Sequence, residues 1–284
     1  MPIDPSKALG ASLGGGEYSW TKDDVILYHL GLNAGVNATD PQELEYTYEK
    51  NLKVLPSFGV IPVFGALAGM GGIEGLDFNF AMLLHGEQDI TLHQPIPTDA
   101  TVVNSGKVAE LWDKGKACLC VLESESREKE SGDLLFTNRF SLFLRGEGGF
   151  GGEPGPKAGN DAPDRAPDGV VESPSLPQQA LIYRLSGDKN PLHADPEFAK
   201  MGGFDTPIIH GLCSYGVVCK AVVDDALGGD VTKVARYQAR FAGVGFPGET
   251  YVTEYWNEGD KILIQAKSKE RDAKIISNAA ITLR

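Results

Sequence analysis

The sequence predicts an α+β protein of two tandem units, each an antiparallel sheet wrapped around one long helix. Three observations support this fold class. A Gly- and Pro-rich stretch, residues 146–173, divides the 284 residues into nearly equal parts. The parts before and after it share an internal repeat. In each part a long apolar segment precedes several segments of strand character, and one helix followed by consecutive strands indicates a sheet packed on that helix.

The first unit, residues 1–145, contains an apolar stretch at about 57–70, which we expect to be a fully buried helix because it is apolar nearly all round. Strands are expected over EQDITLH, ATVVNSGKVAEL, KACLCVLES and LLFTNRFSLFL. Residues 146–173 have no apolar periodicity, which predicts a linker or a long surface loop.

The second unit, residues 174–284, contains an apolar segment from Gly211 to Leu227 followed by two glycines, which predicts a helix with a clear end. The segment VARYQARF (234–241) alternates in the manner of a half-buried strand, and ETYVTEYW, KILIQAK and AKIISNAAITL supply three more. Joining the two sheets edge to edge would cover an exposed edge of each.

The internal repeat aligns ILYHLGLNAGVNATDP (26–41) with LIYRLSGDKNPLHADP (181–196) without a gap. Tyr28 matches Tyr183, and later landmarks keep the same order in both halves. We interpret this as a duplication. His29 aligns with an arginine of the second copy, so we expect it at the surface.

The repeat also indicates which half performs chemistry. Asp188 aligns with Asn33, and His193 aligns with Ala38. The two groups that can move protons therefore occur only in the second copy, and the first copy keeps the frame without them. This pattern favours a first unit that holds substrate.

Asp188 and His193 are five residues apart, with Asn190-Pro191 between them. Asn, Gly and Pro favour a bend, which would let both side chains point into one pocket. A carboxylate and an imidazole that share a water can take its proton and deliver one elsewhere, which is general acid–base catalysis. The alternative is structural: the Asp caps a turn, and the His is buried with its hydrogen bonds satisfied.

The segment PIIHGL ends at the start of the long helix, with His210 and Gly211 at the junction. Free backbone N–H groups at a helix start favour a developing negative charge, and a thioester carbonyl becoming enolate-like needs such a donor. An ordinary glycine at a helix start is the alternative. A metal site of His210 with His193 and Asp188 is a minor one.

The composition excludes several classes of function. A net charge of −13 argues against a broad electrostatic surface for nucleic acid or anionic membrane. No run of eighteen apolar residues appears, and the N-terminus lacks the features of a signal peptide, so we expect a soluble intracellular protein without membrane insertion. The four cysteines lack zinc-site spacing and are expected to be buried thiols. Neither Ser186 nor Ser214 lies in a G-x-S-x-G elbow, which disfavours a serine hydrolase.

YRLSGDKNPLH at 183–193 resembles the signature of the hydratase 2 group of MaoC-like dehydratases, including the hydratase portion of peroxisomal multifunctional enzyme type 2. HGLC (210–213), ARF (239–241), LHGEQ (84–88) and FGG (150–152) extend the resemblance over essentially the whole chain. The resemblance implies a double hot-dog fold, usually dimeric. It also implies reversible hydration of trans-2-enoyl-CoA to (3R)-3-hydroxyacyl-CoA, in fatty-acid β-oxidation or related acyl-CoA metabolism, without metal or redox cofactor.

By the same resemblance, Asp188 and His193 activate the water and protonate C2, Asn190 helps to position it, and the amide of Gly211 binds the thioester oxygen. The positions that match substrate contacts of the family are His85, Gly86, Lys114, Gly211 and Phe241. Lys114 would supply a positive charge for the coenzyme A phosphates. We expect a peroxisomal matrix location if the source is a eukaryote and a cytoplasmic one otherwise. The chain ends in ITLR rather than in a Ser-Lys-Leu-type tripeptide, which argues against peroxisomal import.

Two rival functions stay open on the sequence. Hot-dog proteins include acyl-CoA thioesterases, in which an Asp near a helix start directs water at the carbonyl, and release of free thiol would identify that reaction. A non-catalytic acyl-CoA binding module would keep its function when Asp188 is replaced by Asn.

Overall fold

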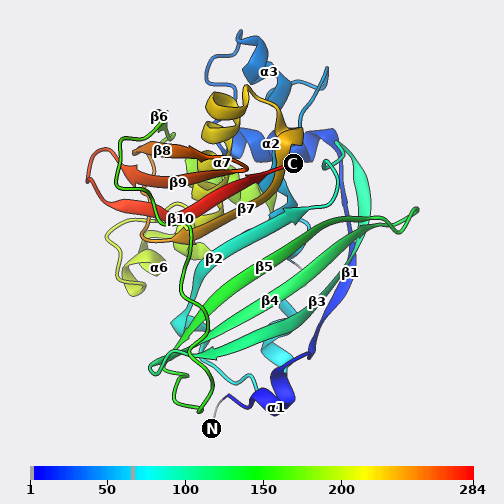
Figure 1. Ribbon diagram of the computed structural model, residues 1–284, viewed down its shortest axis with the longest axis vertical. Coiled ribbons are helices and arrows are strands. Elements are labelled where there is room, and N and C mark those ends of the chain that lie inside the picture. The colour runs from blue at the N-terminus through cyan, green and yellow to red at the C-terminus, as the bar shows by residue number, and fades with distance from the viewer. Residues whose placement is uncertain (1–2, 65–67) are drawn as a thin grey trace.

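The computed structural model describes residues 3–64 and 68–284, which build one ten-stranded antiparallel sheet with helices against it (Figure 1). The strands are β1 (Ser12–Trp20), β2 (Leu83–Leu92), β3 (Ala100–Asp113), β4 (Ala117–Glu128), β5 (Leu134–Arg145), β6 (Gly169–Pro174), β7 (Val234–Phe241), β8 (Thr250–Glu258), β9 (Lys261–Ser268) and β10 (Lys274–Leu283).

The α-helices are α1 (Pro5–Ala8), α2 (Lys22–Gly31), α3 (Pro41–Thr47), α5 (Gln179–Tyr183), α6 (Pro196–Met201) and α7 (Gly211–Leu227). Short 3₁₀ turns are η1 (Pro56–Val60), η2 (Ala68–Gly72), η3 (Phe80–Met82), η4 (Arg184–Ser186), η5 (Pro191–His193) and η6 (Val231–Lys233). None of these helices is long and apolar enough to cross a membrane, a finding that covers the described residues.

The sheet order shows the duplication directly. The strands run β1-β3-β4-β5-β2-β7-β10-β9-β8-β6, so the second half repeats the order of the first in mirror fashion from the junction of β2 with β7. These two strands pair antiparallel from Glu87↔Arg240 to Thr91↔Arg236. The expectation that the two sheets join edge to edge is confirmed.

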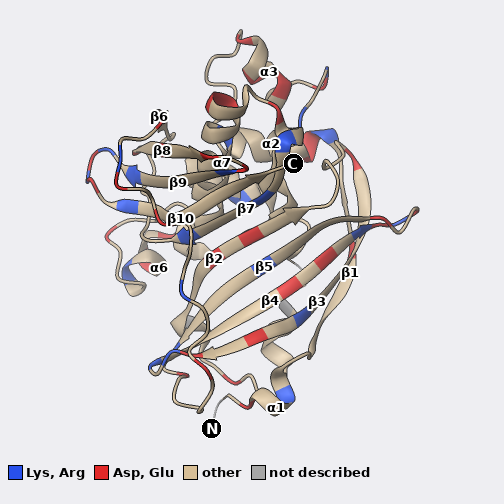
Figure 2. Ribbon diagram, in the orientation of Figure 1, with Lys and Arg blue, Asp and Glu red and all other residues tan. Residues whose placement is uncertain are grey.

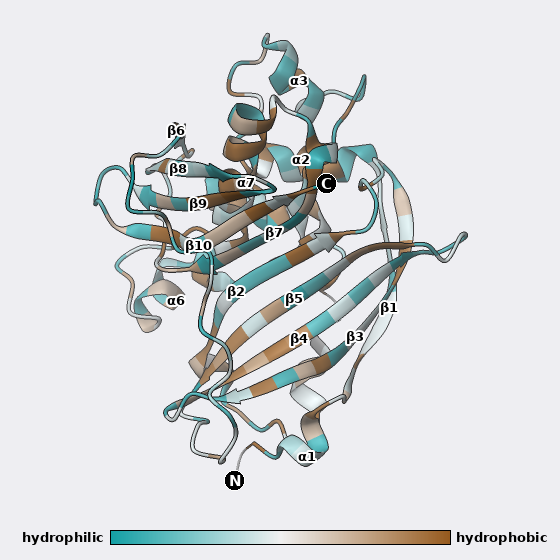
Figure 3. Cartoon of the chain, in the orientation of Figure 1, coloured by the Kyte–Doolittle hydropathy of each residue, from teal (hydrophilic) through white to brown (hydrophobic). Residues whose placement is uncertain are grey.

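Helix α7 is the central helix, and its bounds match the sequence prediction. It contacts η1 and strands β6, β7, β8 and β10, and hydrophobic residues dominate its length (Figure 3). It ends at Gly228, whose φ of 64° is left-handed and favours glycine. This helix supplies much of the core that both halves of the sheet share.

The long helix expected at residues 57–70 of the first unit is wrong for the described residues. That segment forms the 3₁₀ turn η1 and then η2, and residues 65–67 of the expected helix lie outside the described residues. Pro62 lacks an amide hydrogen and clashes with the preceding turn, and five glycines at 59–72 lower helix propensity further. The apolar composition correctly indicated burial, since Phe58 and Val63 are buried.

Three other sequence expectations need correction. His29 is fully buried rather than at the surface: its Nδ1 lies 2.8 Å from the Tyr46 carbonyl, its Nε2 accepts from the Leu55 amide, and burial lowers its pKa to about 4. Strand β1 was not expected, because its GGG run hides any alternation. The end of the expected linker forms edge strand β6, which pairs with β8. Of the expected linker, residues 146–168 therefore lack helix and strand.

The linker is held against the sheet by hydrogen bonds. The Asp113 carboxylate accepts from the amides of Gly149 and Gly151, both at 2.9 Å. The indole N–H of Trp256 donates to the Arg165 carbonyl at 3.0 Å. These bonds fix both ends of the coil segment, so the loop follows a defined path.

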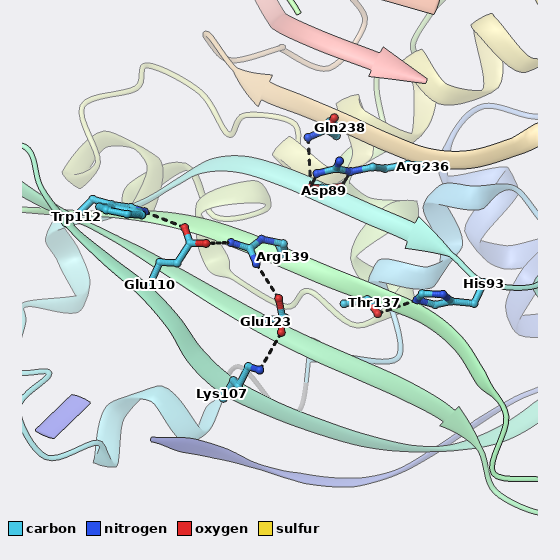
Figure 4. Close-up of polar contacts among 10 residues, drawn as sticks. All are labelled: Asp89, His93, Lys107, Glu110, Trp112, Glu123, Thr137, Arg139, Arg236 and Gln238. Carbon is cyan, nitrogen blue, oxygen red and sulfur yellow. Dashed lines mark hydrogen bonds and ion pairs between the residues drawn. The ribbon is translucent and has the colours of Figure 1, made fainter. Parts of the chain in front are cut away.

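Acidic and basic residues occur on neighbouring strands of the sheet (Figure 2). Figure 4 shows them forming cross-strand ladders. Arg139 on β5 bonds Glu123 on β4 at 2.7 Å and also Glu110 on β3. At the junction of the halves, Arg236 on β7 donates to Asp89 on β2 through Nε at 2.9 Å. Cross-strand pairs of this kind stabilise a sheet and fix its register.

A nearly buried ion cluster joins α7 to α3 and gives a stability prediction. Lys220 lies 2.7 Å from Glu43 and 2.8 Å from Asp224, and its side chain is 12% exposed. Lys220→Met leaves two carboxylates without their cation, so we expect a loss of about 3 kcal/mol in the free energy of unfolding, measured by urea denaturation. Lys200→Met is the matched control, because Lys200 is 60% exposed, and its loss should cost less than about 0.5 kcal/mol. Equal effects of the two changes would contradict the structural role of the cluster.

Candidate active site

A cavity of about 500 Å³ is lined by the start of β2 and the end of β7, the two strands that join the halves of the sheet, and by the start of α7. It is bounded by both halves of the chain. From the second half come Asp188, Asn190, Leu192, His193, Ile208, Ile209, Gly211, Leu212, Ser214 and Phe241–Gly245; from the first come Phe64, Met70, Phe80, Leu83, Leu84, His85, Phe140 and Leu142. Its polar groups are therefore concentrated in the second half, and the first half contributes a mainly apolar wall.

The signature segment folds into two tight turns that place Asp188 in this cavity. Helix α5 and η4 end at Gly187, whose φ of 137° is open to glycine and strained for other residues. Asp188 then accepts from the Asn190 amide through Oδ1 at 3.0 Å, closing an Asx turn. Asn190 in turn accepts from the Leu192 amide at 3.0 Å and caps η5. Asp188 and Asn190 thus shape the turn as well as lining the cavity.

His193 ends η5 and is oriented by the backbone. Its Nδ1 lies 2.9 Å from the Ile208 carbonyl, and since a carbonyl only accepts, Nδ1 carries the hydrogen. Nε2 is then the unprotonated nitrogen, available to take a proton. Burial lowers the pKa of His193, while the Ile208 hydrogen bond and the Asp188 charge partly raise it. The expectation that the bend brings both side chains into one pocket is confirmed.

Gly211 is the first residue of α7, and its neighbour His210 is the N-cap. The side chain of His210 makes no capping bond, and the first amides of a helix have no carbonyl partner within it. An added Cβ at Gly211 would lie 3.3 Å from the Phe241 ring, so this ring covers the glycine closely. The amide of Gly211 therefore has no partner within the helix, and Gly211 lines the same cavity as Asp188 and His193.

His85 on β2 also lines the cavity. Its ring packs edge-on against Phe241 at 4.9 Å between centroids, and its Nε2 lies 3.0 Å from the Glu87 carbonyl. Burial lowers the pKa of His85 to about 4, so it is neutral at physiological pH. It is a hydrogen-bonding residue of the wall rather than a charged one.

The structure does not bring every candidate residue to this cavity. Gly86 lies at a bulge of β2, where a Cβ would meet the Phe143 ring at 2.5 Å. Lys114 lies in the turn between β3 and β4, where its Nζ donates to the Pro154 carbonyl, and it borders a groove on the charged face of the sheet instead. Neither residue is among those that line the cavity of Asp188 and His193.

The side chains of Asp188, His193 and His210 bring one oxygen and two nitrogens within 4.8 Å of one another. Such a set can bind a metal ion only where its lone pairs converge. The two imidazoles are stacked with 28° between their planes, so their in-plane lone pairs run alongside each other. This geometry suits proton transfer better than metal coordination.

The first half was expected to hold substrate, and His85 was expected to contact it, but the other residues of the apolar wall and the role of Ile208 in orienting His193 were not predicted. Apart from Leu84 and His85 in the LHGEQ segment, the wall residues are scattered between positions 64 and 142 and carry no motif. The Ile208 contact is made by a backbone carbonyl, which every residue type possesses, so the sequence holds no signal for it.

Comparison with known proteins identifies the family. Residues 18–146 match the MFE-2 hydratase 2 N-terminal domain, and residues 158–279 match the MaoC-like domain. The enoyl-CoA hydratase ChsH3 of Mycobacterium tuberculosis is 44% identical over 278 residues, which cover 97% of each chain.

Solved structures agree with these matches. A MaoC-like dehydratase from Phytophthora capsici superposes with a TM-score of 0.86 at 32% identity, covering 99% of both chains. A conserved hypothetical protein of Mycobacterium tuberculosis, described as having a double hotdog fold, superposes with a TM-score of 0.56 at 12% identity and covers 98% of this chain and 97% of its own. That second likeness shows the fold alone. The double hot-dog fold is thus confirmed, and the chain belongs to the MaoC-like hydratase 2 family.

Proposed function

We propose that the protein catalyses the reversible hydration of trans-2-enoyl-CoA to (3R)-3-hydroxyacyl-CoA as a hydro-lyase. The observation that carries this proposal is the placement of Asp188, His193 and the Gly211 amide in one cavity whose remaining wall is mainly apolar. Asp188 and His193 act as general acid and base: they remove a proton from the water that attacks C3. The Gly211 amide stabilises the negative charge that develops on the thioester oxygen. The hydratase relatives support the same reaction.

The two halves divide the work in this proposal. The second unit, residues 174–284, supplies the acid–base groups, and the first unit, residues 1–145, supplies the wall that holds the acyl chain. Phe64, Met70 and Phe80, which lie in the segment around η1–η3 of the first unit, line the cavity. Lys114 remains a proposed contact for the coenzyme A phosphates and would first have to release the Pro154 carbonyl.

The proposed hydration is tested by measuring the enoyl-thioester absorbance of crotonyl-CoA and trans-2-decenoyl-CoA over time in the presence of the protein. The chirality of the product is then determined. We expect the absorbance to fall and the product to be the (3R)-hydroxyacyl thioester. A thiol reagent in parallel reports free coenzyme A. Thiol release at the rate of substrate loss would assign the protein to the thioesterases, and binding without turnover would assign it to the non-catalytic acyl-CoA modules.

The apolar wall gives a prediction on chain length. Leu83→Trp adds volume to the wall at a half-buried position of β2. We expect KM for trans-2-decenoyl-CoA to rise by about tenfold, while the constants for crotonyl-CoA change by less than about twofold, because only the longer chain reaches this part of the wall. An equal effect on both substrates would show that the acyl chain lies elsewhere.

The pKa of His193 gives a prediction on pH. The neutral imidazole is the form that takes a proton from water, and burial lowers its pKa below 6.5. As pH falls through this lowered pKa the base becomes protonated, so we expect the acid limb of kcat/KM due to His193 to lie below pH 6.5. Steady-state rates across the acid and neutral range check this. A limb centred above pH 6.5 would contradict the desolvated site.

Assembly as a homodimer stays a prediction from the family resemblance. Sedimentation velocity at two protein concentrations tests it. A single species with the mass of one chain at both concentrations would contradict it.

A further inference from the structure

His210 lies against the His193 ring and the backbone of Asp188 but is not among the residues that line the cavity. It is 1% exposed and directly precedes α7. Its Nε2 lies 3.2 Å from the backbone carbonyl of Asp188. A carbonyl accepts, so Nε2 carries the hydrogen, and the bond ties the start of α7 to the turn that carries Asp188.

The imidazole of His210 is packed between two other rings. It stacks on His193 with 3.7 Å between centroids, and Tyr183 lies on it at 5.0 Å with a 52° tilt. Tyr183 in turn contacts Tyr28 of the first half, with centroids 5.9 Å apart. A continuous line of four buried rings therefore runs from the frame of the first half to the catalytic histidine.

We propose that His210 is a positioning residue for the hydration reaction. Its Nε2–H bond fixes the backbone of Asp188, and its ring fixes the plane of the His193 imidazole. Because His210 directly precedes Gly211, its position also sets the orientation of the Gly211 amide. One residue thus sets the relative geometry of the three groups that act on the substrate. The inference rests on the proposed function.

The charge state of His210 suits this role. Burial, together with the neighbouring His193, lowers its pKa to about 3, and Arg184 lowers it further while the bond to Asp188 opposes the shift. His210 is therefore neutral over the working range of pH. A neutral stacked ring shields His193 from water without repelling the imidazolium that forms during the reaction. The charged groups acting on the two histidines are Asp188 and Arg184.

Two substitutions separate the hydrogen bond from the stacked ring. His210→Phe keeps a ring against His193 and removes the donor to Asp188, so we expect kcat to fall by about 10- to 100-fold because Asp188 is misplaced, with KM within about threefold. His210→Gln keeps a donor and removes the ring. Water then reaches His193, its pKa rises toward the unperturbed value, and the acid limb of kcat/KM should move to higher pH. The acid limb of His210→Phe should stay in place.

His29→Gln is the matched control, because His29 is a second fully buried histidine with hydrogen bonds to the backbone but lies outside the cavity. It should lower the melting temperature and leave kcat within about twofold. The inference is overturned if both His210 variants keep kcat within about threefold and the native acid limb. If one variant does not fold, the other decides by its own readout. A wild-type protein that does not hydrate crotonyl-CoA would instead refute the proposed function.

Discussion

Asp188→Asn is expected to lower kcat for hydration of crotonyl-CoA by about 100-fold or more. The asparagine keeps the size of the side chain, and its oxygen can still accept from the Asn190 amide at the position that now lies at 3.0 Å. The turn should therefore survive. What the substitution removes is the negative charge and the ability to carry a proton beside His193.

His193→Gln is expected to cause a loss of similar size, and the double variant should lose little more than either single one. Two groups that pass one proton act as a unit, so their effects are strongly non-additive. Stopped assays with product quantified by chromatography give the range needed for such slow variants. Independent, multiplying losses would mean that the two residues serve separate steps.

Asp195→Asn is the matched control for charge and chemistry. Asp195 is exposed, seven residues beyond Asp188, and caps α6 by accepting from the Glu197 amide at 2.9 Å. Its replacement should cost at most about 1 kcal/mol of stability and leave kcat unchanged. A 100-fold loss with this variant as well would show that the assay reports folding rather than catalysis. Activity that survives Asp188→Asn and His193→Gln would refute the assignment of the pair.

Gly211→Pro is expected to lower kcat by about 10²- to 10³-fold, the usual cost of one oxyanion donor. Proline is well tolerated at the first position of a helix, since that amide has no partner in the helix. His210 has a φ of −56° and a ψ of 136°, which a residue before proline readily adopts. The substitution therefore removes the N–H from the cavity while α7 can still begin at the same residue.

Gly211→Ala separates the loss of the amide from the added bulk. Alanine keeps the N–H and brings its Cβ to 3.3 Å from the Phe241 ring, as proline also does. We expect a loss of about tenfold or less for alanine, because Phe241 must shift by a few tenths of an ångström. The ratio of the kcat values of the alanine and proline variants measures the contribution of the N–H. Equal losses would mean that the glycine is needed only for space.

The fold class and the second unit could be predicted in detail because their signals are local. Helix α7 is a mainly apolar segment with a glycine stop, and strand β7 alternates from Ala235 onward, so apolar composition and periodicity located both. The secondary structure of the first unit was harder to predict. Its segment at 57–70 is equally apolar, but Pro62 and the glycines prevent a continuous helix, and apolar composition alone predicts burial without its secondary structure. Edge strand β1 was missed because its GGG run hides any alternation, and β6 was missed because its six residues (GVVESP) alternate only between half-buried and exposed positions and carry no alternating apolar pattern.

The candidate site also has one part that local sequence predicts and one part that it does not. The repeat made Asp188 and His193 the candidates for acid–base chemistry by sequence alone, since the frame is kept twice and the proton-carrying groups only once. The bend that brings them together follows from Gly187, Asn190 and Pro191, which lie within five consecutive positions of the chain. Local residue chemistry was sufficient for this part.

Contacts between distant segments were decided by the tertiary structure. His210 stacks on His193 seventeen positions away and bonds a carbonyl of Asp188 twenty-two positions away. The apolar wall comes from the first half, and Lys114 lies outside the cavity that the signature builds. The sequence by itself determined which groups can carry the proton, because that depends on residue type and local turn chemistry. Only the packing of the two halves determined what surrounds those groups, because their neighbours and their burial depend on which distant surfaces meet.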